Sequence, residues 1–345
     1  MLKQLSIKNF KSIGNQSFEL KPLTILTGLN STGKSSVIQS ILLLSKHASR
    51  RNQGLVSDYV ENFSDFSEIR NKYLNAKSLS IKAKNEQHTF SLSMDYDKTT
   101  FTPKKECSDL NFEDKLYYVS ANRIGQESLA SFSKEQKTGR HGEYIFGYFE
   151  SNKDKPLFSD IIKFKDSSTL KYQVNGWLNY ILELSINLQT DKITATHVRV
   201  SFDVDGINDI NPFNIGAGNS YLAKILITGL LCNKDDILLI ENPEIHLHPK
   251  AQSRLGEFFA WLAQNGIQLI VETHSEHLIN KLRHQVYRKM LDADNITIYY
   301  KESITKDFMN IAINNSGHFI NSAGERMQFP SGFFDSTLKE LLEIG

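Results

Sequence analysis

The chain has 345 residues, of which 40% are hydrophobic and 23% are charged, as in an ordinary globular protein. Its 40 basic and 39 acidic side chains leave a formal net charge of +1, so no bulk charge attracts it to nucleic acid or to an anionic membrane. Cys107 and Cys232 show no metal-ligand spacing and favour free thiols in a reducing compartment. The sequence shows no signal peptide and no apolar run long enough to cross a membrane, so we expect a cytoplasmic protein without a membrane partner.

Short strand-like segments and one helical pattern alternate in the first part of the chain. Residues 1–10, MLKQLSIKNF, and 23–27 predict strands, and the second strand runs directly into Gly28. Residues 35–47 are rich in long apolar side chains and predict a helix. Further along, 78–83 and 88–94 are β-like, whereas the loop-rich, charged residues 127–165 are typical of a mobile insertion.

The C-terminal half is more regular. The pattern predicts helices at 219–231, at 249–265 and from about Glu276, with buried strands at 236–241 and 267–272 between them. Strands and helices in this alternation predict a parallel sheet with helices on its faces. Residues 295–300 and 308–314 predict a closing pair of strands.

Residues 28–35 read GLNSTGKS, which matches the phosphate-binding pattern G-x-x-x-x-G-K-[ST] between a strand and a helix. Glycines allow the backbone to wrap around phosphates, and the helix adds its positive N-terminal end. Lys34 would reach the β- and γ-phosphates, and the Ser35 hydroxyl would bind Mg²⁺. The residues predicted to hold ATP in this loop are Gly28, Leu29, Asn30, Ser31, Thr32, Gly33, Lys34, Ser35 and Ser36.

Two polar residues stand at the ends of the later buried strands. Glu241 ends the strand ILLIE, and His274 follows the next strand, LIVE. In open α/β sheets, residues just past the carboxyl ends of parallel strands face the ligand crevice. We therefore expect 28–35, Glu241 and His274 to converge on one nucleotide, with Glu241 serving Mg²⁺.

The complete set of motifs resembles a known family. The opening, NFKS followed by LTILTGLNSTGKSS, is similar to the start of SMC-like and OLD-like ABC ATPases. ENPEIHLHP and ETHSEHLIN look like their Walker B, D-loop and H-loop block, and MQFPSGFFD is similar to a short C-terminal module of uncharacterised AAA-type ATPases. The resemblance implies an α/β P-loop NTPase head with a mixed or parallel sheet, flanking helices and a β-rich lobe.

The resemblance also implies how the chain is divided. We expect the N-terminal part of the head with the phosphate loop at 1–100, an insertion or Q-loop region with a helical lobe at 101–205, the signature, Walker B and H-loop half at 206–300, and the C-terminal module at 301–345.

In this family each ATP lies between two heads, so the resemblance implies a homodimer in which the partner head supplies a signature motif. NIGAGNSY resembles that motif, with two small residues and a hydroxyl before a helix, at Gly216, Gly218 and Ser220. Lys11 matches a basic residue that helps to bind phosphate in relatives. Asn122 and Arg123 are the candidates for the Q-loop.

One departure concerns catalysis. Standard ABC heads carry two acids at the end of the Walker B strand, whereas this chain has Glu241 followed by Asn242, which cannot accept a proton as a carboxylate does. Glu244 is a candidate replacement. We therefore predict a slow or partner-dependent ATPase whose catalytic residues are Glu241, Asn242, Glu244 and His274, with Ser35 and Glu241 as Mg²⁺ ligands.

The resemblance also bears on biology. Many relatives belong to bacterial anti-phage defence or toxin-like modules beside a nuclease partner. The chain ends before a nuclease domain of the kind that OLD-like relatives carry, so we expect an effector, a nuclease or a toxin, to be encoded nearby and to be regulated or recruited by the ATP-bound dimer.

Three alternatives remain open. Zinc-type ligands occur close together, at Glu244, His246, His248, Glu272, His274 and His277, but a zinc hydrolase would leave GLNSTGKS unexplained. A scaffold clamped by ATP without hydrolysis would suit Asn242. An SMC-like DNA maintenance ATPase would bind backbone phosphates through basic stretches such as 104–105 and 134–140, although such clusters are more often solvated surface.

Overall fold

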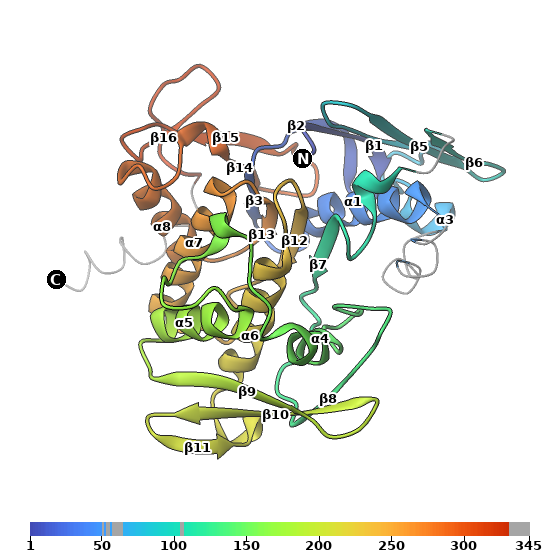
Figure 1. The fold of residues 1–345 in the computed structure, drawn as a ribbon. Coiled ribbons are helices and arrows are strands. Elements are labelled where there is room, and N and C mark those ends of the chain that lie inside the picture. The colour runs from blue at the N-terminus through green and yellow to red at the C-terminus, as the bar shows by residue number, and fades with distance from the viewer. Residues whose placement is uncertain (50–51, 53–55, 57–64, 104–106, 331–345) are drawn as a thin grey trace.

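The computed structural model describes residues 1–49, 52, 56, 65–103 and 107–330. Its centre is a seven-stranded mixed sheet in the order β16-β15-β14-β3-β13-β12-β7 (Figure 1). The strands are β3 (Leu23–Gly28), β7 (Leu116–Val119), β12 (Ile237–Glu241), β13 (Gln268–Glu272), β14 (Ile296–Lys301), β15 (Met309–Ile313) and β16 (Phe319–Ile320). The five strands from β14 to β7 are parallel, and β15 and β16 add antiparallel pairs. The predicted α/β class and the closing strand pair are confirmed.

Helices cover one face of this sheet. They are α5 (Leu170–Leu182), α6 (Ala217–Leu231), α7 (Pro249–Gln264) and α8 (Glu276–Tyr287). Proline at the first position starts α7, and the Ser275 side chain caps α8 by accepting a hydrogen bond from the amide of Leu278. Trp177 of α5 packs edge-on against Phe258 of α7, with ring centroids 4.9 Å apart, so the helices share one core with the sheet.

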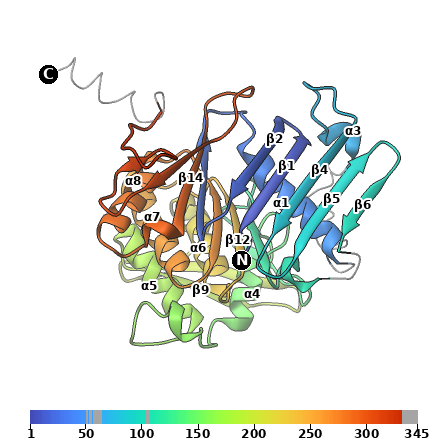
Figure 2. The same cartoon turned by 90° about the horizontal axis from the view of Figure 1, so that it is seen from above.

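The opposite face carries α1 (Lys34–Ala48) and an antiparallel lobe (Figure 2). The lobe sheet has the order β2-β1-β4-β5-β6, formed by β1 (Gln4–Phe10), β2 (Ile13–Glu19), β4 (Ser78–Lys84), β5 (Thr89–Asp95) and β6 (Thr99–Thr102). Buried and exposed side chains alternate along β4 and β5, because only one face of the lobe packs on the rest of the protein. The short helix α3 (Phe66–Ile69) precedes β4. The predicted β-rich lobe is confirmed.

The predicted mobile insertion at 127–165 is wrong. The structure places β8 (Leu129–Ser131) and α4 (Ile145–Asn152) there, and β8 joins β9 (Ile186–Lys192), β10 (His197–Val204) and β11 (Ile207–Ile210) in a small sheet. Phe146 and Phe149 of α4 are fully buried in the helical core. Burying two aromatic rings stabilises a segment by several kcal/mol, on the order of 2 kcal/mol for each ring, so this region is part of the fold.

The chain after α8 continues the main sheet. The expected boundary at residue 301 coincides with the end of β14, and β15 and β16 continue the same sheet beyond it. Most of MQFPSGFFD, at 331–335, lies outside the described residues, as do 104–105.

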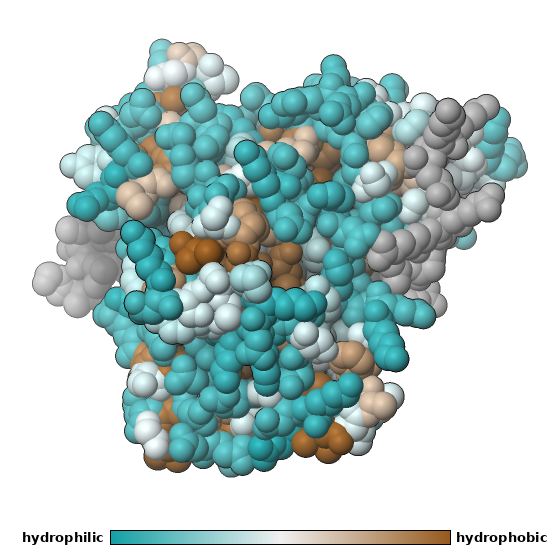
Figure 3. Space-filling model, viewed as in Figure 1, coloured by the Kyte–Doolittle hydropathy of each residue, from teal (hydrophilic) through white to brown (hydrophobic). Residues whose placement is uncertain are grey.

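In the described part of the chain, no helix is long and apolar enough to cross a membrane. Figure 3 shows a mostly hydrophilic face with hydrophobic side chains gathered in a central hollow.

Candidate functional site

The glycine-rich turn between β3 and α1 has a backbone that only glycine accommodates at two points. Gly28 has φ 135°, and a Cβ there would lie 2.1 Å from the carbonyl oxygen of Lys301. Gly33 caps α1 in a left-handed conformation, φ 106°, where a Cβ would meet the Ser12 hydroxyl at 1.9 Å. The two glycines of the motif therefore bring β14 and Ser12 against the loop, and α1 starts at Lys34 with its N-terminus facing the turn.

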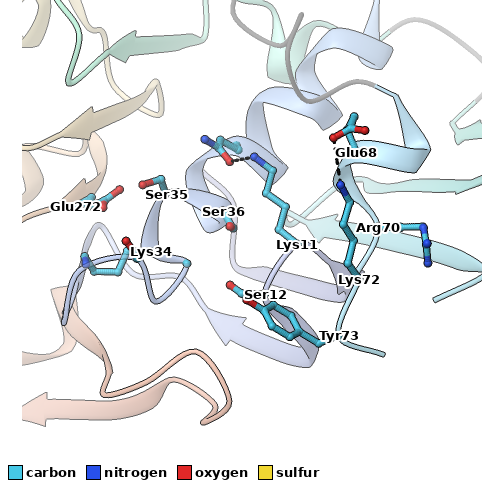
Figure 4. A pocket seen from close by; sticks show the side chains of 13 residues that line it. Lys11, Ser12, Lys34, Ser35, Ser36, Glu68, Arg70, Lys72, Tyr73 and Glu272 are labelled. Carbon is cyan, nitrogen blue, oxygen red and sulfur yellow. Dashed lines mark hydrogen bonds and ion pairs between the residues drawn. The ribbon is translucent and has the colours of Figure 1, made fainter. Parts of the chain in front are cut away.

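A cavity of about 370 Å³ opens beside this turn (Figure 4). Lys34, Ser35 and Ser36 line it from the first turn of α1, and Glu272 lines it from the end of β13. The remaining wall comes from Lys11, Ser12, Ser31, Gly33, Gln39, Glu68, Arg70, Lys72 and Tyr73. Cationic side chains and helix-terminal amides on one wall make the cavity suitable for a phosphate group.

The two predicted phosphate-binding lysines are held in place. The Lys34 ammonium donates to the carbonyls of Gly28, at 3.2 Å, and Leu29, at 2.7 Å, and is only 3% exposed. Burial lowers the pKa of Lys34, while Glu272 and Glu244 nearby act in the opposite direction. Lys11 donates to the Gln39 side chain at 2.6 Å, and burial lowers its pKa as well. Leu29, Asn30 and Ser31 are exposed, and the Thr32 hydroxyl donates to the Leu29 carbonyl at 2.9 Å.

Glu241 and Glu272 end neighbouring parallel strands as register partners. One Glu241 oxygen accepts from the amide of Ala121 at 3.3 Å, whereas its other oxygen and one oxygen of Glu272 are buried without a hydrogen-bond partner. Burial raises the pKa of Glu241. Burial, and then the Glu241 charge, raise the pKa of Glu272 to about 7. Two buried carboxylates, each with one oxygen that lacks a hydrogen-bond partner, favour the binding of a cation beside them.

Asn242 follows β12 in a left-handed conformation, φ 43°. Its amide donates to the carbonyl of Glu272 at 2.9 Å, and its side-chain oxygen is buried without a partner. Its carbonyl accepts from Arg123 at 3.1 Å, and Arg123 also donates to the carbonyl of Glu241 at 3.1 Å. Burial lowers the pKa of Arg123 to about 10, and its guanidinium lies over the Tyr221 ring.

Of the two Q-loop candidates, Arg123 is buried and its hydrogen bonds reach main-chain carbonyls, while Asn122 is exposed. Neither lines the cavity. The nearby Gln126 donates its side-chain amide to the carbonyls of Pro212 and Ile215, at 2.8 and 2.7 Å, and so holds the segment that precedes α6.

Glu244 and His274 lie next to each other. One Glu244 oxygen accepts from the Thr273 hydroxyl at 2.8 Å, and the other accepts from the amide of His274 at 2.7 Å. Burial, followed by the charge of Lys34, lowers the pKa of His274, so its ring is neutral at pH 7. Both oxygens of Glu244 are therefore engaged in positioning the loop that carries His274. The prediction that Glu244 takes part in catalysis stays a prediction.

The signature candidates differ in detail from the expectation of small residues and a hydroxyl before a helix. Gly216 is the N-cap of α6, but Gly218 and Ser220 lie inside its first turns. A Cβ on Gly218 would stand 2.5 Å from the carbonyl oxygen of His246, and Ser220 is fully buried with an unpartnered hydroxyl. Gly218 therefore allows α6 to approach the loop after β12. None of the three lines the phosphate cavity of its own chain.

The zinc alternative gains no support. Among the described residues, the group whose ligand atoms lie within 4.8 Å of one another is His88, Cys107 and Asp109, in and beside the β-rich lobe. None of the six residues suggested for a zinc hydrolase belongs to that group.

Glu272 was considered only as a zinc ligand, and the structure makes it a wall of the phosphate cavity. The rule that placed His274 at the strand edge applies equally to the last residue of the same strand, so a signal for Glu272 was present. Gln39 and Ser12 were also missed, because their proximity depends on how α1 and β1 pack.

Comparison with known proteins agrees with this geometry. The Old nuclease of Escherichia phage P2 is 24% identical over 342 residues, covering 81% of this chain and 57% of that protein. An energy-coupling factor transporter ATP-binding protein of Streptococcus thermophilus is 31% identical over 70 residues, covering 20% of this chain and 24% of that protein. The chain thus spans little more than half, and about a quarter, of these two relatives.

Solved structures show the same fold at low sequence identity. An Smc head bound to the C-winged helix domain of ScpA has a TM-score of 0.60 at 11% identity, covering 91% of this chain and 98% of that one. An Smc head with an extended coiled coil, from Pyrococcus furiosus, has a TM-score of 0.57 at 12% identity, covering 90% and 96%. The fold is therefore that of an SMC-type ATPase head.

The family described as "AAA domain, putative AbiEii toxin, Type IV TA system" matches residues 67–280, well over half of the chain. Together with the strand–turn–helix around Lys34 and the in-register strand ends, this match shows that the chain belongs to that family, within the OLD-like, ABC/SMC-like P-loop ATPases.

Proposed function

We propose that the chain binds ATP with Mg²⁺ at the β3–α1 turn and hydrolyses it slowly. The observation that carries this proposal is the shared cavity of Lys34, Ser35 and Glu272, with Glu241 on the adjacent strand. Backbone amides at the start of α1 and the Lys34 ammonium would hold the β- and γ-phosphates. The nucleotide-binding residues are those predicted from the sequence, 28–36 and Lys11.

The residues at the strand ends suit a hard divalent cation. The orphaned carboxylate oxygens and the Ser35 hydroxyl are oxygen donors, the kind that Mg²⁺ prefers. Ser35 and Glu241 would hold the Mg²⁺, which would supply positive charge to offset the negative charge that develops during phosphoryl transfer. Neither Glu241 nor His274 lines the cavity itself. The proposed roles are that Glu241 serves the Mg²⁺ from the adjacent strand and that His274, whose backbone amide is held by Glu244, hydrogen-bonds near the γ-phosphate.

Hydrolysis is proposed to occur in a homodimer. Gly216 does not line the cavity of its own chain, so a role in phosphate binding requires a second head that presents its α6 N-terminus to the nucleotide. Ser220 is fully buried inside α6, so its hydroxyl does not reach the surface that a second head would meet. The SMC-type fold supports this arrangement.

The dimer would regulate or recruit an effector, a nuclease or a toxin, in bacterial anti-phage defence. Support comes from the family description, which names a putative toxin, and from the similarity to a phage Old nuclease. A reading frame for such an effector beside this one, and its co-purification only with ATP-loaded protein, are the expected findings.

The decisive experiment compares the wild type with Lys34→Ala. Equilibrium binding of a fluorescent ATP analogue and Mg²⁺-dependent phosphate release should both be lost in Lys34→Ala, because no other described ammonium donates to the loop carbonyls. Lys46→Ala, which changes a lysine at the far end of the same helix, is the matched control and should behave as the wild type. A wild-type protein that takes up no nucleoside triphosphate would contradict the proposal.

A second candidate function, an ATP-clamped scaffold, is favoured by one observation. Asn242 stands where a second acid is usual, and its side-chain oxygen is buried. ATP-dependent dimerisation without phosphate release, in the presence and absence of DNA, would select the scaffold. Binding of duplex DNA with a steep salt dependence would instead favour the SMC-like DNA maintenance function.

A further inference from the structure

Two acidic residues lie side by side at the end of the main sheet, and one of them, Glu272, lines the phosphate cavity. Glu241 and Glu272 are Cα partners in adjacent parallel strands, so both side chains leave the sheet at its carboxyl edge and toward the same face. Each carboxylate keeps one buried oxygen with no hydrogen-bond partner, and the two residues are 8% and 5% exposed. Uncompensated carboxylates in such a setting repel each other and lack the water that would solvate them.

Nearby cations do not satisfy these oxygens. The Lys34 ammonium donates to the carbonyls of Gly28 and Leu29, and the guanidinium nitrogens of Arg123 donate to main-chain carbonyls. The hydroxyl of Ser35 points toward Glu272 across the first turn of α1 (Figure 4). Ser35 and Glu272 thus offer oxygen ligands at one edge of the cavity, and Glu241 lies beside Glu272 on the adjacent strand.

We infer that Glu272 is a second acidic ligand of the Mg²⁺ site, beside Glu241. This inference rests on the proposed ATP and Mg²⁺ binding and assigns a further ligand to it. Asn242 follows Glu241 along the chain, whereas Glu272 comes from the neighbouring strand, and the amide of Asn242 donates to the main-chain carbonyl of Glu272. The second carboxylate is therefore provided across the sheet instead of along the strand.

Glu272 is better suited to bind Mg²⁺ than the other acidic residues near the cavity. Glu68 also lines the cavity, but its side chain is 63% exposed and pairs with Lys72 at 3.2 Å. Glu244 uses both oxygens to hold Thr273 and His274. Of the acidic residues that line the cavity in the described part of the chain, Glu272 is the buried one with an oxygen left for a cation.

The test uses Mn²⁺ as a probe whose free form is counted by electron paramagnetic resonance. The full chain is loaded with a non-hydrolysable ATP analogue, and Mn²⁺ is titrated into the wild type, Glu272→Gln, Glu241→Gln and the matched control Glu68→Gln. We expect the Mn²⁺ Kd to rise about tenfold or more in Glu272→Gln and in Glu241→Gln, and to stay within about twofold in Glu68→Gln. Loss of a group that only supports a metal ligand already weakens metal binding about 10–100-fold, so loss of a ligand should do at least as much.

Binding of the same analogue in EDTA separates the inference from the proposed function. Glu272→Gln should bind the metal-free analogue as well as the wild type or better, because it removes a negative charge beside the phosphates. A Mn²⁺ Kd in Glu272→Gln within about twofold of the wild type, with Glu241→Gln weakened, would overturn the role of Glu272 alone. A wild type that binds no analogue in either condition would overturn both.

Folding of the variants is checked by thermal melting of the apo protein. Glu272→Gln should melt at the same temperature as the wild type or higher, because the like-charge contact is removed. If Glu272→Gln does not fold, Glu272→Asp gives the readout, since it keeps the charge and shortens the reach. A Mn²⁺ affinity between those of the wild type and Glu241→Gln is expected for it, and an unchanged affinity would contradict the inference.

Discussion

The guanidinium of Arg123 donates a hydrogen bond to the main-chain carbonyl of Glu241 at 3.1 Å, across 118 positions of sequence. Through its second nitrogen it also binds the carbonyl of Asn242. Arg123, in the loop after β7, thereby fixes the backbone from which the β12 acid projects. Its guanidinium also lies over the Tyr221 ring, 5.1 Å from the ring centroid.

Arg123→Ala should lower the free energy of unfolding by about 2–4 kcal/mol, since it removes a buried cation and leaves several buried carbonyls unpaired. Urea unfolding followed by circular dichroism measures this loss. Arg199→Ala is the control, because Arg199 forms ion pairs with Asp191 and Asp209 at the solvent-exposed surface, where such pairs contribute little to stability. Equal losses in the two variants would argue against the anchoring role of Arg123.

Alanine variants of Gly218 and Gly216 test two roles separately: the packing of α6 and the proposed contact with nucleotide. In Gly218→Ala the new methyl group would press on the carbonyl of His246, and we expect a loss of about 1–3 kcal/mol in unfolding free energy. A Cβ at Gly216 would meet nothing within 4 Å, and its φ is −55°, so Gly216→Ala should leave the stability unchanged.

Gly216→Ala nevertheless places a methyl group where the partner's phosphates are proposed to lie. Size-exclusion chromatography with and without ATP should therefore show weaker ATP-dependent dimerisation for a fully stable protein. Wild-type dimerisation in this variant would speak against the signature role of Gly216.

His47 should make the protein sensitive to mild acid. Burial, and then the charge of Lys46, lower its pKa from 6.5 to about 4. The folded state therefore binds this proton less readily than the unfolded state, so the stability due to neutral His47 is complete above pH 6.5 and is lost as the pH falls toward 4.

This shift corresponds to at most about 3 kcal/mol. In His47→Gln, the difference in unfolding free energy between pH 6.5 and pH 4.5 should be smaller than in the wild type. Chemical denaturation at closely spaced pH values measures it, and an identical pH profile would show that His47 does not contribute.

His274→Ala should keep nucleotide binding but reduce phosphate release by roughly 10²-fold or more, in the range of losses for a positioned hydrogen-bonding or acid–base group. His277→Ala, on the same loop–helix segment and exposed, is the control and should retain the wild-type rate. Loss of rate in both variants would point to a general effect on α8 and not to the position of His274.

The site residues that could be predicted from the sequence are those marked by their immediate neighbours along the chain. The turn at 28–35 carries its own signal, and Glu241 and His274 are marked because each follows a run of buried apolar residues. Arg123 is named from the sequence as a Q-loop candidate, but its hydrogen bonds to the end of β12 could not be predicted, since its partners are more than a hundred positions away. Glu272 carries the same strand-end signal as His274, but its pairing with Glu241 depends on β12 and β13 being adjacent and in register.

The error at 127–165 has a different cause. Charged residues and glycines on both sides concealed the helix α4, whose buried rings Phe146 and Phe149 are separated by Gly147 and Tyr148. A Cβ on Gly147 would stand 2.5 Å from the carbonyl of Ser131. This residue is therefore a contact point between α4 and β8, although a glycine in sequence suggests a break.

The Glu244 carboxylate, in the loop after β12, accepts one hydrogen bond from the Thr273 hydroxyl and one from the amide of His274. It therefore joins the loops after β12 and β13. The loop after β12 carries His246 and His248 at the surface, and His248 caps α7. A protein that displaced this exposed loop would therefore also move the backbone of His274, because the Glu244 carboxylate joins the two loops.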